Sequence, residues 1–242
     1  MALPAALVAG SFLGVVIRRL PDGRAVALGR SQCDTCGHVL GMRELVPLVS
    51  FILQRARCRH CGAAIGWFHP AIELAAFGVA LAAFLRAPDG WTLWVDAALG
   101  WALLAAAWID AERQILPDAI TLPVLLAGLA VTSLQAPWAI DDHALASLLG
   151  YAGFRLLDLL YLRLRGRHGL GQGDAKLLAA AGAWAGLAAL PQILLAAGLL
   201  GLAIALPAAW RRGEGGRTMI PFGPALGAAF FVSVLLGGGV GI

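Results

Sequence analysis

Long apolar runs dominate this chain and restrict its possible folds more than any other feature. Short polar connections separate most of these runs, which lie at 1–17, 70–86, 92–109, 119–136, 143–162, 175–190, 192–210 and 220–240. Each is close to the roughly 17–25 residues that a helix needs to cross a bilayer. The pattern predicts an all-α polytopic membrane protein with about eight transmembrane helices.

Composition excludes the soluble alternatives. Hydrophobic residues make up 60% of the 242 positions and charged residues only 13%, which is too apolar for a water-soluble domain. The net charge of +4 could suggest a nucleic-acid partner. The cations lie in short loops without forming one basic face, so we expect anionic lipid as the neighbour and no nucleic acid. The first run lacks the basic start and the cleavage site of a signal peptide, so we read it as a helix.

The basic residues predict the orientation of the helices. Of eighteen Lys and Arg residues, sixteen lie in four segments, at 18–59, at 113, at 163–176 and at 211–217. Alternating helices place these four segments on one face, and the positive-inside rule makes that face cytoplasmic. Both termini are then expected outside.

The polar segment 18–69 contains all four cysteines and separates the first helix, 1–17, from a seven-helix domain at 70–242. The cysteines form two CxxC pairs, each followed by glycine: Cys33, Cys36, Cys58 and Cys61. This spacing is typical of a structural four-thiolate zinc site. Two disulfides or a redox pair are the alternatives, but a cytoplasmic loop is reducing and no thioredoxin-like pattern surrounds either pair. We expect exposed histidines, not ligands, at His38 and His60.

Two aspartates stand at the ends of apolar runs on the predicted cytoplasmic face. Asp110 ends one run, where the helix macrodipole disfavours an anion. Asp174 follows three glycines in six residues, 169–174. Glycines permit unusual backbone angles and close approach of another chain. Helix capping would not require them, and no strand precedes them as in a nucleotide-binding loop. An acid at membrane depth is a candidate for function.

Other acids have simpler interpretations. Glu73 is expected to cap the start of its own helix, and Asp118, directly after Pro117, is expected to be an N-cap. Arg155 and Asp158 lie three residues apart on a predicted helix, so they can neutralise each other as a structural pair.

Paired aspartates suit peptide hydrolysis. Two close carboxylates do not both ionise easily, so the pair shares one proton and supplies a general base and a general acid together. We therefore predict that Asp110 and Asp174 form a catalytic pair. Without substrate they can rest far apart.

Several motifs together make the whole chain resemble the bacterial prepilin peptidases, or type IV leader peptidases. They are Gly10-Ser11-Phe12-Leu13, the two CxxC pairs, Asp110 with Leu116-Pro117-Asp118, Gly171-Gln172-Gly173-Asp174-Ala175-Lys176, and Ile220-Pro221-Phe222-Gly223-Pro224. The resemblance implies an inner-membrane GxGD aspartic protease. Such enzymes cut the basic leader from type IV prepilins and type II secretion pseudopilins at the cytoplasmic face. It assigns Asp110 and Asp174 to catalysis and the four cysteines to zinc.

The resemblance further implies N-methylation of the new N-terminus with S-adenosylmethionine, in a region that includes Glu44. Gly171, Gly173 and Lys176 belong to its catalytic motif. Pro221, Phe222 and Gly223 are candidates for a substrate groove, although ordinary helix-start chemistry also explains the prolines.

Two other functions stay open. A presenilin-like or signal-peptide-peptidase-like GxGD protease would cut within a membrane helix of its substrate. A non-enzymatic scaffold would use the zinc loop to bind pilus assembly proteins. A homodimer is compatible with the sequence, which does not decide the oligomeric state.

Overall fold

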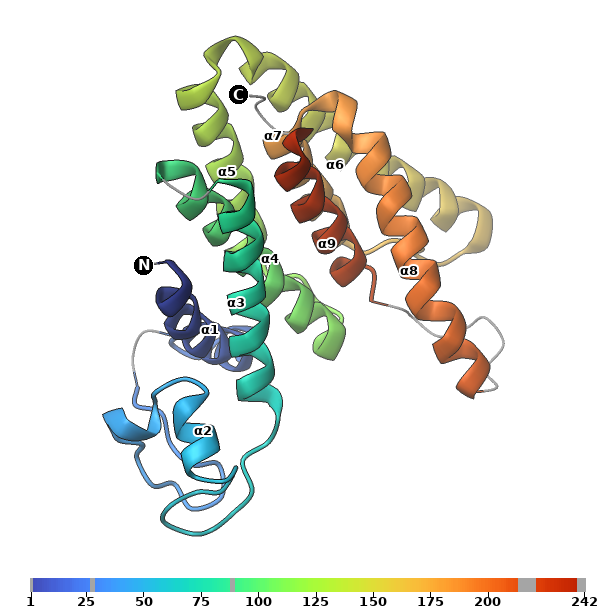
Figure 1. The fold of residues 1–242 in the computed structure, drawn as a ribbon. Helices are drawn as coiled ribbons and strands as arrows, with labels where there is room; N and C mark the ends of the chain where they lie inside the picture. The colour runs from blue at the N-terminus through green and yellow to red at the C-terminus, as the bar shows by residue number, and fades with distance from the viewer. Residues whose placement is uncertain (1, 27–28, 88–89, 213–220, 239–242) are drawn as a thin grey trace. The chain divides into compact units, whose positions relative to one another are not determined.

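The computed structural model describes residues 2–26, 29–87, 90–212 and 221–238, which form helices joined by loops (Figure 1). The α-helices are α1 Ala2–Arg19, α2 Val49–Leu53, α3 Phe68–Arg86, α4 Gly90–Arg113, α5 Asp118–Gln135, α6 Ile140–Arg165, α7 Gln172–Ala185, α8 Leu190–Arg212 and α9 Gly223–Ser233. Short helical turns are η1 Leu20–Asp22, η2 Met42–Glu44, η3 Pro137–Ala139, η4 Leu187–Ala189 and η5 Val234–Gly238. Within these described ranges no strand forms, and the predicted all-α class is confirmed.

Within the described residues, five helical segments are long and apolar enough to cross a membrane. They are Phe68–Arg86, Gly90–Arg113, Asp118–Gln135, Pro137–Arg165 and Leu187–Leu206. Large apolar side chains such as Leu148, Leu156 and Leu164 of α6 are exposed, as expected where lipid is the solvent. The chain is therefore a multi-pass membrane protein by the length and composition of its helices.

The predicted apolar run 175–190 does not form one helix. It breaks at Gly186, whose φ of 74° ends α7, and η4 then leads into α8. With 14 residues, α7 is about 21 Å long, shorter than the roughly 30 Å of a hydrocarbon core. This segment is therefore a short internal helix.

Small residues let α7 pack closely against its neighbours α5, α6 and α9 (Figure 1). A Cβ added to Gly182 would lie 2.6 Å from the backbone carbonyl carbon of Ala146 in α6. The side chains of α7 from Leu177 to Ala185 are all buried. Backbone contact of this kind is the usual way in which membrane helices associate. The apolar stretch after Asp174 is thus buried in protein.

The chain divides into two compact units, Met1–Trp101 and Ala102–Ile242. In the first unit, α1 and α3 lie side by side (Figure 1). A Cβ on Gly10 would lie 2.7 Å from the Cα of Glu73, so the glycine of the Gly-Ser-Phe-Leu motif brings the two helix backbones together. The second unit contains α5 to α9 and the end of α4. The three-part division at 1–17, 18–69 and 70–242 stays a prediction.

The predicted role of Glu73 is wrong. Because α3 begins at Phe68, Glu73 lies in its second turn, and its carboxylate accepts a 2.8 Å hydrogen bond from the backbone N–H of Leu48. Leu48 has a φ of 57° and directly precedes α2. Glu73 therefore ties the polar loop to α3 and does not cap its own helix.

Parts of two predictions lie outside the described residues. The basic segment 211–217 continues into 213–220, and the predicted helix 220–240 begins and ends in undescribed residues. Ile220 of the Ile-Pro-Phe-Gly-Pro motif falls there as well.

Candidate active site and metal centre

Asp110 lies in the last turn of α4, and its side chain is buried. Its Oδ2 atom accepts a 2.9 Å hydrogen bond from the backbone N–H of Gly223, the first residue of α9. The macrodipole of α4 disfavours an anion here, but the positive end of α9 faces the same carboxylate. A Cβ on Gly223 would lie 2.6 Å from this oxygen. Glycine at this position therefore allows the amide to reach Asp110.

Asp174 lies in the first turn of α7, after two glycines that allow close packing. A Cβ on Gly171 would lie 2.8 Å from Oδ2 of Asp174, and one on Gly173 would lie 2.6 Å from Cβ of Leu116. The backbone angles are ordinary, since Gly171 has a φ of −71° and Gly173 lies within the helix. These two glycines therefore allow close packing within the chain and do not adopt the unusual backbone angles that glycine permits, whereas close approach of a substrate chain stays a prediction.

One cavity of about 300 Å³ contains both aspartates. Its lining comes from the end of α4, the connection to α5, and the start of α7: Asp110, Gln114, Ile115, Leu116, Asp118, Gly171, Gln172, Gly173, Asp174 and Lys176. The structure thus brings together two acids that are 64 positions apart in the sequence, as the predicted pair requires. Leu116 and Gln172 belong to the motifs that carry the resemblance, whereas Gln114 and Ile115 are lining residues that the sequence analysis did not name.

The surroundings of Asp174 favour its protonated form. Burial raises the pKa of its carboxyl group to about 6, and the nearby charge of Asp110 acts in the same direction, against a lowering hydrogen bond from the Gly171 amide. A raised pKa next to a second carboxylate is the arrangement by which two acids share a proton. The site can therefore offer an acid and a base near neutral pH.

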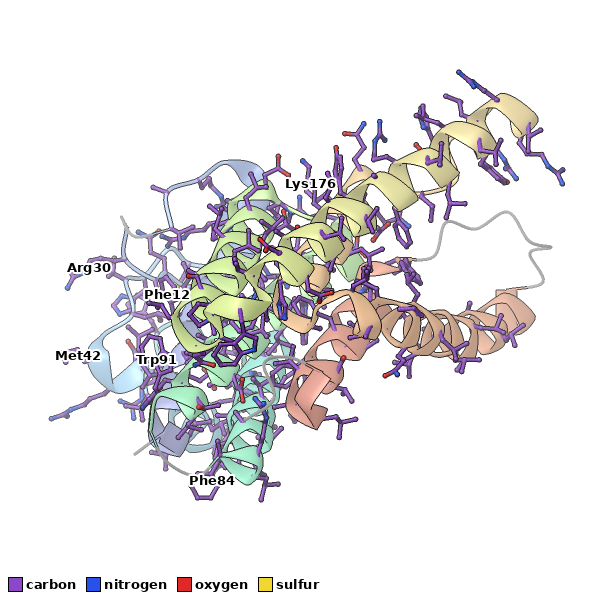
Figure 2. All side chains as sticks on the ribbon, turned by 90° about the horizontal axis from the view of Figure 1, so that it is seen from above. Phe12, Arg30, Met42, Phe84, Trp91 and Lys176 are labelled. Atoms are coloured by element: carbon purple, nitrogen blue, oxygen red, sulfur yellow. The ribbon has the colours of Figure 1, made fainter. Side chains whose placement is uncertain are left out.

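An ion pair lies at the same cavity. Lys176 Nζ is 2.5 Å from Oδ1 of Asp118, which is 57% exposed; Lys176 is labelled in Figure 2. Asp118 is not the predicted N-cap, because Pro117 occupies that position and no side chain caps α5. The ion pair connects the start of α5 to the start of α7.

The candidates for a substrate groove lie beside the cavity and do not line it. Gly223 contacts Asp110, as described above. The ring of Phe222 lies 6.5 Å from the ring of Phe154, centroid to centroid, and both Pro221 and Phe222 are partly exposed. Their role in binding substrate stays a prediction.

The structure also assigns Asp158 contacts that the sequence did not predict. Besides its contact with Arg155, its carboxylate accepts hydrogen bonds from the backbone N–H groups of Gly169 and Leu170. These partners are eleven and twelve residues away, beyond the reach of a local helix pattern. These two backbone hydrogen bonds connect α6 to the loop that precedes Asp174.

The four cysteines come together in the first unit. The Sγ atoms of Cys33, Cys36, Cys58 and Cys61 all lie within 4.8 Å of one another. Sulfur atoms about 3.8 Å apart are expected around a tetrahedral zinc with bonds of about 2.3 Å, and Cys33 Sγ lies 3.9 Å from Cys61 Sγ. The thiols are free. The donor set therefore fits a zinc ion better than two disulfides.

The two CxxC segments have the same backbone geometry. The N–H of Gly37 donates to Cys33 O and that of Gly62 to Cys58 O, both at 2.9 Å. Each glycine has a positive φ, 69° and 72°, so the glycines allow both turns. The rings of His38 and His60 stack on each other with centroids 4.7 Å apart, outside the cysteine group. The two CxxC segments thus form equivalent turns, and each contributes two thiols to the cysteine group.

Glu44 lies in η2 of the same unit, where its Oε2 accepts a 2.8 Å hydrogen bond from the N–H of Gly41. Its neighbour Met42 is 90% exposed and, with Arg30, lies at the edge of this unit (Figure 2). This contact stabilises a turn, and no part of the described structure assigns Glu44 a chemical role.

Comparison with known proteins covers almost the whole chain. The family described as "Bacterial Peptidase A24 N-terminal domain" matches residues 5–87, and the "Type IV leader peptidase family" matches residues 97–206. A protein of Burkholderia pseudomallei strain K96243 named "Prepilin leader peptidase/N-methyltransferase" is 39% identical, over 98% of this chain and 84% of its own length.

Proteins with the same name from Aeromonas hydrophila and Pseudomonas aeruginosa are each 34% identical, over 96% of this chain and 88% of their own length. No solved structure matches. The matches extend through both compact units, including the cysteine segment and both aspartates. The chain belongs to the type IV leader peptidase family.

Proposed function

We propose that this protein is a membrane aspartic endopeptidase that removes the basic leader of type IV prepilins and type II secretion pseudopilins and then N-methylates the new N-terminus. One observation carries the peptidase activity: Asp110 and Asp174 line the same cavity of about 300 Å³. The relatives' name supports both activities.

In this mechanism the two carboxyl groups work as one pair that holds one proton. The ionised carboxylate removes a proton from water, whose oxygen attacks the peptide carbonyl carbon while the protonated partner donates to the carbonyl oxygen. The tetrahedral diol then collapses as one of its hydroxyl groups returns a proton to the pair. The C–N bond breaks and the amine nitrogen takes a proton from the pair. The raised pKa of Asp174, about 6, supports a proton on the pair near neutral pH.

The active site is proposed to face the cytoplasm, in a bacterial inner membrane that the chain crosses several times. The last turn of α6 and the loop that follows it contain Arg163, Arg165 and Arg167, and cations of this kind favour the cytoplasmic side. A prepilin inserted as an apolar helix would then keep its basic leader in the cytoplasm and place the scissile bond at the membrane surface.

For the first unit, we propose a structural zinc ion bound by Cys33, Cys36, Cys58 and Cys61. Four thiolates with their sulfur atoms within 4.8 Å support this assignment. Zinc would stabilise the polar loop and take no part in hydrolysis. S-adenosylmethionine is the proposed methyl donor, on the strength of the relatives' name.

The peptidase proposal is tested with the purified full chain and a peptide that has a basic leader followed by an apolar helix. We expect Asp110→Asn and Asp174→Asn each to lower kcat by about 100- to 10,000-fold, because each removes one half of the acid and base pair. Asp141→Asn is the matched control, since Asp141 is an exposed acid in the first turn of α6, and it should cleave like the wild type.

The products identify the alternatives. Cleavage in the middle of the apolar helix would favour a presenilin-like protease. A wild-type protein that leaves the peptide intact would favour a scaffold. Unchanged cleavage by both asparagine variants would refute the catalytic pair.

A further inference from the structure

The buried acid Asp158 has contacts that an ion pair with Arg155 does not explain. Its side chain is 2% exposed, and Arg155 is its most distant partner at 3.4 Å. With a proton on Nδ1, His168 donates to Oδ2 over 2.8 Å. The N–H groups of Gly169 and Leu170 both donate to Oδ1, over 3.0 and 3.2 Å. Its closer contacts are therefore made with the loop between α6 and α7.

The loop lies against α6 at further points. Gly166 closes α6 in the left-handed conformation, with a φ of 68°. A Cβ on Gly169 would lie 2.7 Å from the Tyr161 ring, so the loop backbone lies directly on that ring. Arg167 contacts the Tyr161 hydroxyl at 3.4 Å. The path of the chain from α6 to α7 is thus fixed by α6 itself.

This path ends at the candidate active site. The backbone N–H of Leu170 donates a hydrogen bond to Asp158. Asp174 follows Leu170 by only four positions. Gly171 and Gly173, between them, already fit tightly against Asp174 and Leu116. A shift of the loop would therefore move the start of α7 and the carboxyl group of Asp174 with it.

We propose that Asp158 is a positioning residue of the peptidase, which fixes the 168–171 loop so that Asp174 enters the cavity beside Asp110. The inference rests on the proposed function. General packing of α6 on α7 would hold the whole helix. Here the position of Asp174 is assigned to one pair of backbone hydrogen bonds, from Gly169 and Leu170 to Asp158, near the start of α7.

The chain contains a matched control at the other end of α7. Asp142, also on α6, accepts a 2.9 Å hydrogen bond from the N–H of Leu187, just after α7 ends. It is sixteen residues before Asp158, about 24 Å along the helix. Both acids therefore bind backbone next to α7, but only Asp158 does so at the cavity.

The experiment compares Asp158→Ala, Asp158→Asn and Asp142→Ala with wild type in the full chain, by steady-state cleavage of the leader peptide. We expect Asp158→Ala to lower kcat by about 100-fold, since small displacements of reacting groups have effects of this size, with KM within about twofold. Asparagine retains an oxygen for both loop amides, so Asp158→Asn should recover most of the loss. Asp142→Ala should retain kcat within about twofold.

Hydrogen exchange provides a readout that does not need activity. In Asp158→Ala, exchange should rise in residues 168–175, whereas Asp142→Ala should raise it near Leu187. Wild-type kcat in Asp158→Ala would overturn the inference, and so would an equal loss in Asp142→Ala or no recovery by asparagine. If the wild type cleaves nothing, the proposed function fails. In that case, unchanged hydrogen exchange at 168–175 in Asp158→Ala would still show that Asp158 does not fix the position of the loop.

Discussion

The two candidate catalytic residues occupy different surroundings. Asp110 is buried in the last turn of α4 and accepts a hydrogen bond from the first backbone N–H of α9. Burial of Asp174 and the nearby charge of Asp110 raise its pKa to about 6, although a hydrogen bond from the Gly171 amide acts in the opposite direction. A carboxyl group that titrates close to neutral pH beside a second carboxyl group is suited to acid and base catalysis. The same arrangement lowers the stability of the folded protein when Asp174 is ionised.

The stability of Asp174→Asn should therefore depend on pH. Asp174 titrates near 6 when folded and near its ordinary value of 3.8 when unfolded. Its folded-state protonation thus contributes stability below pH 3.8, and this contribution is lost as pH rises through 6. A neutral asparagine avoids the loss. Above pH 6 we expect the free energy of unfolding of the variant to exceed that of wild type by at most about 3 kcal/mol. Below pH 4 the two free energies should be equal.

Thermal unfolding in detergent between pH 4 and pH 8 measures this difference. Asp141→Asn, which replaces an exposed acid, is expected to show no such trend. A difference between Asp174→Asn and wild type that stays constant with pH would contradict the prediction.

At the scale of elements, α7 is the helix around which the second unit packs. It is shorter than the five described segments that are long and apolar enough to cross a membrane, and its small residues bring its backbone against α6. Asp174 at its start is consequently placed by a helix with little freedom to move. Packing of this kind makes the position of the acid depend on single glycines.

A methyl group at the contact of α7 and α6 should destabilise the protein. In Gly182→Ala the new Cβ would lie 2.6 Å from the carbonyl of Ala146, so the helices must separate, at a cost of about 1–3 kcal/mol. Gly153→Ala is the control, because no atom lies within 4 Å of its added Cβ and alanine favours helix. Thermal unfolding of both variants checks this. Equal stability of the two would show that the close contact is not important.

At the scale of the whole molecule, the cysteine group and the aspartate cavity belong to different compact units. Each unit has its own buried helix contacts, α1 with α3 in the first and α7 with its neighbours in the second. The proposed zinc site therefore stabilises the loop of the first unit without contributing a residue to the cavity.

Removal of metal should affect the first unit selectively. We expect one zinc per chain by metal analysis, and on chelation we expect faster hydrogen exchange in residues 31–65, because the four thiolates lose their shared ligand. Amides of α7 should exchange at the same rate before and after chelation. A Cys33→Ser Cys58→Ser variant is the control, because it lacks two of the four thiolates and chelation should leave its exchange rates unchanged. Metal-free protein with intact thiols would refute the zinc site, and faster exchange in α7 would refute the independence of the units.

Some features could be predicted because their signals are local. The helical class follows from the long apolar runs, and the grouping of the four thiols follows from two CxxC turns with glycine at a positive φ. The contacts of Glu73 with Leu48, of Asp118 with Lys176 and of Asp158 with Gly169 could not be predicted, since these partners are remote in sequence. The pair of Asp158 with Arg155, three residues away, was predicted and is confirmed. Helix-capping rules and spacing rules describe only neighbours within about one turn.

The sequence by itself thus determined the apolar helices, the membrane class, the cysteine pairs and the two acids at the ends of apolar runs. Only the tertiary structure decided that Asp110 and Asp174 share one cavity, that α9 offers its first amide to Asp110, and that α7 stops at Ala185. The reason is physical. Apolar content and turn residues act along the chain, whereas the surroundings of a carboxylate depend on backbone groups that packing brings from distant elements.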